Sequence, residues 1–121
     1  MEVISIEING RRKAYAVREL FNKAFPNLKL EFYAKPHTKD GPHSEKIVTS
    51  SRLTIADCRT VDHNGMLVIE PGMTTTELKN HLRDTFGLKG EVFKWNGASW
   101  QPVDSGKQSL ENLNKLNGPI L

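Results

Sequence analysis

The sequence has one cysteine, Cys58, so no disulfide can form within the chain. A lone cysteine is typical of proteins that work in a reducing compartment. The sequence also lacks an apolar run close to the roughly 18 residues of a membrane span, and its first residues do not follow the basic-then-apolar order of a signal peptide. We therefore expect a cytoplasmic protein with no membrane association.

Motifs for catalysis and for cofactors are scarce as well. The nine glycines are scattered among turns and form no phosphate-binding loop, and no His or Cys spacing matches a tetrahedral zinc site. Cys58, Asp62 and His63 lie within six residues, which keeps a small thiol enzyme or hydrolase as a third hypothesis. Because no complete catalytic motif is assembled, we expect a non-enzymatic protein without a cofactor or a metal.

What is present is the composition of an ordinary soluble globular protein, with 37% hydrophobic and 26% charged residues. A chain of 121 residues of this kind predicts a single domain, spanning 1–121. The net charge of +3 is uneven, because residues 1–60 hold eleven Lys and Arg against seven Asp and Glu, whereas residues 61–121 hold six against seven. The positive charge of the first half bears on partners more than on fold.

Two segments of the chain resemble each other. "VRELFNKAFPNLKLEFY" (17–33) aligns with "LKNHLRDTFGLKGEVF" (78–93) when one gap follows the shared Phe, so that Phe25 matches Phe86 and Glu31 matches Glu91. An alternating apolar stretch with a turn precedes each segment, and a short capped apolar segment follows each. We interpret this order as an internal repeat, with pseudo-repeats at about 1–60 and 65–116. Chance similarity between amphipathic elements is the alternative.

The periodicity of apolar residues predicts the elements. Alternation predicts strands at 3–8, 28–33, 66–69 and 88–95. Helical spacing predicts long helices at about 15–25, with Tyr15 and Leu20 on its apolar side, and at about 75–86. Thr74 and Glu77 have the spacing of a capping box, and Gly87 predicts the end of that helix. The sequence thus predicts an α+β fold. Each pseudo-repeat runs strand, helix, strand, loop or strand, short helix, and the helices pack on a mixed or antiparallel sheet.

The stretch "GEVFKWNGASWQPV" (90–103) places three large aromatic residues around an Asn-Gly turn, the strongest short hairpin signal. A two-residue turn would pair Trp95 with Ala98 and Phe93 with Trp100, which puts all three aromatic residues on one face. The repeat aligns Phe93 with Tyr33, whose face also carries charged residues. Tyr33, Phe93, Trp95 and Trp100 are therefore candidate partner-binding residues. The alternative is that a helix or the C-terminal segment covers them as core.

Basic residues of the first half form a candidate anion site. The insert "AKPHTKDGPHSEK" (34–46) stands where the second half has its tight hairpin, and its prolines and glycine predict a long loop. The segment "GRRKAYAVR" adds positive charge at the start of the first helix, where it opposes the helix dipole. The candidate anion-binding residues are Arg11, Arg12, Lys13, Lys35, His37, Lys39, His43 and Lys46. A solvated loop is the alternative for the histidines.

The patterns "T-x-x-E-L-K" (74–79) and "F-G-L-K" (86–89), with a looser match at 18–32, resemble a group of small uncharacterised bacterial proteins that carry two strand–helix–strand units. The resemblance covers most of the chain and implies the two-repeat α+β build, but no function. From the residues, we expect a non-catalytic module for protein–protein interaction that uses the aromatic hairpin or an edge strand, with a homodimer as one arrangement. The alternative is weak nucleic-acid or phosphate binding through the basic first half.

Overall fold

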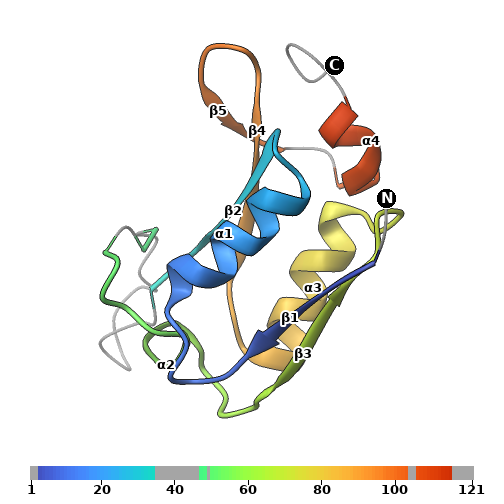
Figure 1. Cartoon of the computed structure of the whole chain (residues 1–121). Coiled ribbons are helices and arrows are strands. Elements are labelled where there is room, and N and C mark those ends of the chain that lie inside the picture. Colours follow the sequence, from blue (N-terminus) through green and yellow to red (C-terminus); the bar gives the residue numbers. More distant parts are fainter. Residues whose placement is uncertain (1–2, 35–46, 49, 104–105, 116–121) are drawn as a thin grey trace, which may run out of the picture.

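The computed structural model describes residues 3–34, 47–48, 50–103 and 106–115. The described ranges contain both helices and strands (Figure 1), which confirms the predicted α+β class. Within the same ranges, no helix has the combined length and apolar character that crossing a bilayer requires. The elements are β1 (Ile4–Ile8), α1 (Ala14–Ala24), β2 (Leu28–Phe32), α2 (Ile55–Cys58), β3 (Gly65–Ile69), α3 (Thr75–Phe86), β4 (Gly90–Trp95), β5 (Trp100–Pro102) and α4 (Leu110–Lys115).

Among the described residues, the strands form two sheets rather than one, and every strand pairing is antiparallel. β1 pairs with β3, with Ile6 opposite Leu67 at the middle of the ladder. The second sheet has the order β2-β4-β5, so β2 and β5 are its edge strands. α1 packs on β2 and β1, and α3 packs on β4. Figure 1 shows the β4–β5 hairpin at one end of the molecule and α2 at the opposite end.

One apolar core joins both sheets and the helices. Its members are the inward residues of the alternating strands and one stripe of each helix. In α1 the buried stripe is narrower than the sequence pattern predicts, because only Ala14, Val17 and Phe21 are fully buried. Tyr15 and Leu20, which were predicted to belong to the apolar side, are exposed. Their positions fall outside the arc that β1 and β2 cover, so the helix presents Tyr15 to solvent.

The ends of the long helices follow from local chemistry. The hydroxyl of Thr74 accepts the Glu77 amide at 3.1 Å, which satisfies one of the otherwise unpaired N–H groups of the first turn of α3. α3 ends at Gly87, whose φ of 65° lies in the left-handed region. α1 ends before Pro26, and the Phe25 amide still donates to the Phe21 carbonyl at 2.9 Å. The predicted end residues of α3 are thus confirmed.

The two halves of the chain make matching backbone contacts. The Ile55 amide donates to the Arg12 carbonyl at 2.8 Å, and the Leu110 amide donates to the Met73 carbonyl at 2.8 Å. In the same way, a bridge joins Lys13 to Thr54 in the first half and Thr74 to Ser109 in the second. Each short helix is therefore held against the loop that precedes the long helix of its own half.

The left-handed residue Gly87 provides a test of this packing. A Cβ at Gly87 would lie 2.7 Å from the backbone nitrogen of Val61 and 2.9 Å from the Thr60 hydroxyl. We expect Gly87→Ala to lower the free energy of unfolding by about 2 kcal/mol, because it adds both a left-handed β-carbon and a clash with backbone. Urea denaturation of the purified variant measures the change.

Gly72→Ala is the matched control. A Cβ at Gly72 has no atom within 4 Å, and Gly72 is exposed. We expect this control to change the unfolding free energy by less than about 1 kcal/mol. Equal midpoints for the two variants would contradict the role given to Gly87.

Candidate binding face

The alternation of β2 and β4 separates a buried face from an outer face. Leu28, Leu30 and Phe32 point into the core, whereas the residues between them point outward. We call the outward surface of the β2-β4-β5 sheet the outer face, and it consists of Lys29, Glu31, Tyr33, Glu91, Phe93, Trp95, Trp100 and Pro102. All four residues predicted to contact a partner lie on this face.

The hairpin between β4 and β5 differs from the predicted one in its turn. Trp95 pairs with Trp100 and Phe93 pairs with Pro102, so the predicted pairing of Trp95 with Ala98 is wrong. The cause is Asn96, whose side-chain oxygen accepts the Ala98 amide at 2.9 Å and the Ser99 amide at 2.8 Å. These bonds close a longer loop. Because the partner shifts by an even number of residues, the aromatic side chains stay on one face.

Aromatic rings and one ammonium group form a cluster on the outer face. The rings of Trp95 and Trp100 meet edge to face, with centroids 5.4 Å apart. Trp95 is 37% exposed, and Phe93 and Trp100 are half-buried. The Lys29 ammonium lies 5.3 Å from the Phe93 ring centroid and 5.1 Å from that of Trp100. Each cation–ring pair contributes about 0.5–1 kcal/mol at such an exposed site. The Lys29 ammonium therefore favours the observed positions of both rings.

A matching cation–ring pair lies at the other end of the β2–β4 ladder. The Lys89 ammonium is 4.7 Å from the ring centroid of Tyr33. The Tyr33 amide donates to the Lys89 carbonyl at 3.0 Å, so the two residues are direct neighbours across the strands. Lys29 and Phe93 are likewise opposite each other in the ladder. The outer face therefore has an aromatic residue with its own lysine on either side of its centre.

Two glutamates occupy the centre of the outer face. Glu31 on β2 pairs directly with Glu91 on β4. Each glutamate has a cation from the long helix of its own half, since Arg18 contacts Glu31 at 2.7 Å and Lys79 contacts Glu91 at 3.2 Å. Lys29 adds a second cation 3.6 Å from Glu31, which is buried. The like charges of the glutamates are thus balanced by Arg18, Lys29 and Lys79.

A groove of about 510 Å³ runs between α1 and the edge of β2. One wall is an outward stripe of α1, and the other is formed by Lys29 and the Trp100 ring. The groove is lined by Tyr15, Arg18, Glu19, Asn22, Lys29, Leu30, Ser51 and Trp100. It therefore continues the aromatic cluster towards the helix and offers donors, acceptors and rings within one concave surface.

Lys94 lies on the buried side of β4, opposite the aromatic cluster. It is fully buried, and burial lowers the pKa of its ammonium group from the usual value. The alternation of β4 determines this position, because Lys94 stands between the outward residues Phe93 and Trp95. Lys94 therefore does not belong to the binding face.

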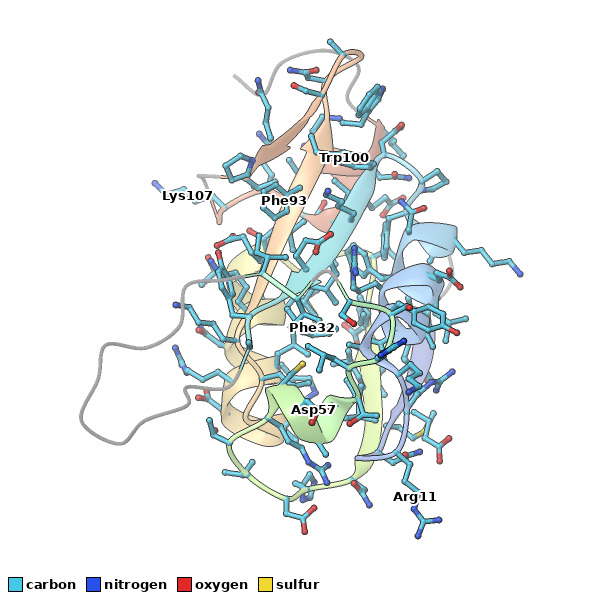
Figure 2. The ribbon with its side chains drawn as sticks, turned by 90° about the vertical axis from the view of Figure 1, so that its left-hand side faces the viewer. Arg11, Phe32, Asp57, Phe93, Trp100 and Lys107 are labelled. Carbon is cyan, nitrogen blue, oxygen red and sulfur yellow. The ribbon has the colours of Figure 1, made fainter. Side chains whose placement is uncertain are left out.

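The predicted anion-binding residues that the structure describes, Arg11, Arg12 and Lys13, do not share a surface with the tryptophans. Arg11 lies at one end of the molecule, whereas Phe93 and Trp100 lie in the opposite half (Figure 2). Arg12 donates to the Glu7 carbonyl at 2.9 Å, and Lys13 donates to the Arg52 carbonyl at 3.0 Å, both close to Arg11. The other predicted members, Lys35, His37, Lys39, His43 and Lys46, lie outside the described residues.

Cys58 lies in the core at the end of α2, where Leu113 occupies the corresponding position in α4. Burial, followed by the charge of Asp57, raises the pKa of the Cys58 thiol to about 11. A thiol with this pKa is protonated at neutral pH and is a poor nucleophile. His63, the base considered for it, is exposed and contacts the Phe86 ring at a centroid distance of 5.8 Å.

Comparison with protein-family models, with curated proteins and with solved structures gave no match. The outer face is therefore a candidate site on the basis of its geometry alone. Sequence reasoning did not select Arg18, Lys29, Glu31 or Asn22 as site residues. The alternation of 28–33 already placed Lys29 and Glu31 beside Tyr33, but the strand register and the reach of Arg18 from α1 come from tertiary packing.

The Arg18–Glu31 pair gives a prediction for stability. We expect Arg18→Met to lower the free energy of unfolding by about 2 kcal/mol, because it leaves a buried carboxylate with one cation instead of two. The double variant R18M/E31Q should recover part of this loss, since the buried charge is then removed as well. Urea denaturation of the single and double variants completes the cycle.

Lys79→Met is the matched control, since it removes the corresponding cation from the other half. The Lys79–Glu91 pair is more exposed, with side-chain exposures of 40% and 23%. We expect a loss of less than about 1 kcal/mol for this variant. The same loss for R18M and K79M would show that the burial of Glu31 does not distinguish the two pairs.

The position of Cys58 gives a second prediction. Because its folded-state pKa of about 11 lies above the usual thiol value of 9.0, the thiol is protonated more fully in the folded protein at pH 7. We expect iodoacetamide to label native Cys58 at least about 100-fold more slowly than the urea-unfolded chain, since only the thiolate reacts. Mass spectrometry over time measures both rates. Equal rates would restore the thiol-enzyme hypothesis.

Proposed function

We propose that this protein is a non-catalytic binding module whose outer face contacts a protein partner. The observation that carries the proposal is the aromatic cluster, in which exposed Trp95 meets Trp100 edge to face at 5.4 Å. Large aromatic rings that remain accessible on a formed sheet are unusual in monomers and mark contact surfaces. The cluster has its rings positioned before any partner arrives, so little ordering entropy is lost on binding.

The composition of the outer face favours a protein as the partner. Trp, Tyr and Arg are the residue types that dominate the energetics of protein interfaces. Here Trp95, Trp100 and Tyr33 lie on one sheet with Arg18 at its edge. The face also has charges of both signs, since Glu31 and Glu91 lie at its centre and a lysine lies beside the aromatic residues at each end.

The other hypotheses have less support. A nucleic-acid surface combines stacking rings with several unpaired cations, yet Lys29 is already 3.6 Å from Glu31, and Arg11 lies in the opposite half of the molecule. Catalysis by Cys58 is disfavoured by its burial. Weak anion binding by Arg11, Arg12 and Lys13 remains as the alternative function. We further propose a cytoplasmic protein built by duplication, in which a homodimer would use the same outer face.

The proposal is tested by capture of partners on the immobilised protein from an extract of the cells that produce it. We expect the captured set to lose its main members when the W95S/W100S variant replaces the wild type. A purified member should then bind the double variant at least about 30-fold more weakly in calorimetry, since a central Trp contributes about 2 kcal/mol or more.

The control variant is M66S/V68S, which removes two exposed apolar residues from β3 in the other sheet. It should capture the same partners as the wild type. Circular dichroism checks that both variants are folded. If the tryptophan variant captures the same proteins as the wild type, the outer face is not the binding surface.

A further inference from the structure

Strand pairing joins the two halves of the chain. β1 and β2 belong to the first half, whereas β3, β4 and β5 belong to the second. Among the described strands, β1 pairs with β3 and β2 pairs with β4, so both of these ladders cross from one half to the other. β1 does not pair with β2, and β3 does not pair with β4. Each half therefore completes the sheets of the other.

The pairing between the halves is reciprocal. The alignment that matches Glu31 with Glu91 in the sequence also describes the β2–β4 ladder, where these two residues lie opposite each other. In the other ladder, Ile6 lies opposite Leu67 at the middle, and β1 and β3 have the same order of exposed and buried residues. An interface in which two partners contact each other through corresponding positions is the pattern of a two-fold symmetric dimer.

The short helices add a second pair of reciprocal contacts. The Thr60 amide, which follows α2, donates to the Gly87 carbonyl at the end of α3 at 2.9 Å. In α4, the side-chain oxygen of Asn114 accepts the Asn27 amide, between α1 and β2, at 2.9 Å. Each half thus uses its short helix to hold the turn that follows the long helix of the other half.

A short hinge, 59–64, connects the two halves between α2 and β3. The buried guanidinium of Arg59 holds this hinge closed. It donates to the His63 carbonyl at 3.1 Å and to the Asn64 side-chain oxygen at 2.8 Å, and it forms an ion pair with Asp62. The ladders and the contact of Asn114 do not use the hinge residues, so two separate chains could make them equally well.

We propose that two copies of this chain can exchange halves and form a two-fold dimer through the interface that the halves form within one chain. The first half of one copy pairs with the second half of the other, and the β1–β3 and β2–β4 ladders stay unchanged. Such an exchange keeps the native contacts, so the hinge decides between the two forms. A closed hinge holds the halves at an effective concentration of about a millimolar, which favours the single chain.

The exchanged dimer would have two complete outer faces, since each face combines β2 of one copy with β4 and β5 of the other. Two such faces on one particle would increase the avidity for a multivalent partner. This inference goes beyond the proposed function and does not depend on it, because the halves meet through their strand edges and short helices and not through Trp95 or Trp100.

The test shortens the hinge of the full-length chain by removing Val61, Asp62 and His63. We expect light scattering to give twice the molar mass of the wild-type chain at the same concentration, because a hinge that is too short to fold back favours exchange. Circular dichroism checks that the secondary structure is unchanged.

A cross-link identifies the dimer as the exchanged form. Ser5 and Val68 are exposed and lie opposite each other in the β1–β3 ladder. A hinge-shortened chain with Ser5→Cys and another with Val68→Cys are unfolded in urea, mixed and refolded together. We expect a disulfide between the two chains, and at least about 10-fold less of it when Lys23→Cys, at an exposed position of α1, replaces Val68→Cys. The native Cys58 is buried in all of these variants.

A folded monomer of the hinge-shortened chain would overturn the inference, and so would a dimer without the cross-link. If the shortened chain does not fold, the same cysteine variants are refolded together with the complete hinge at about 1 mM, near the effective concentration of the tether. A cross-link above the level of the Lys23→Cys control then supports exchange, and a yield equal to that control overturns it. Partner capture through the tryptophans is measured separately, so the proposed function can stand when exchange fails.

Discussion

The register of β2 against β4 places Glu31 directly opposite Glu91 at the centre of the outer face. Two carboxylates in such a pair destabilise a sheet unless each has a cation. Arg18 from α1 and Lys79 from α3 supply the cations, at 2.7 Å and 3.2 Å. The long helices must therefore lie where these side chains reach the sheet, so that charge balance and apolar packing position them together.

The same register produces the aromatic surface. Because Glu31 opposes Glu91, Lys29 falls opposite Phe93, and the Lys89 ammonium lies over the Tyr33 ring. A slip by one residue would turn the rings into the core and the apolar residues into solvent. The glutamate pair and the cation–ring pairs are therefore parts of one arrangement. They keep aromatic side chains ordered on a face where burial does not order them.

Much of the fold could be predicted from local signals. The predicted Thr74 cap and the predicted end of α3 at Gly87 were correct, because a helix cap depends on a few neighbouring residues. The predicted turn of the β4–β5 hairpin was wrong because the Asn96 side-chain oxygen accepts two amides beyond the Asn-Gly pair, from Ala98 and Ser99. The division into two sheets and the groove beside Arg18 depend on contacts between distant segments, which periodicity does not encode.

The two halves differ in how they cover the edges of their shared sheet. The second half covers the edge of β4 with its own strand, β5, which also holds Trp100 over Lys29. The first half covers the edge of β2 with the side chains of Arg18 and Asn22. Arg18 also contacts the buried Glu31 carboxylate, so this cover is held by an ion pair as well as by a hydrogen bond. The two edges are linked through Lys29, whose ammonium lies 3.6 Å from Glu31 of β2 and 5.1 Å from the ring centroid of Trp100 in β5.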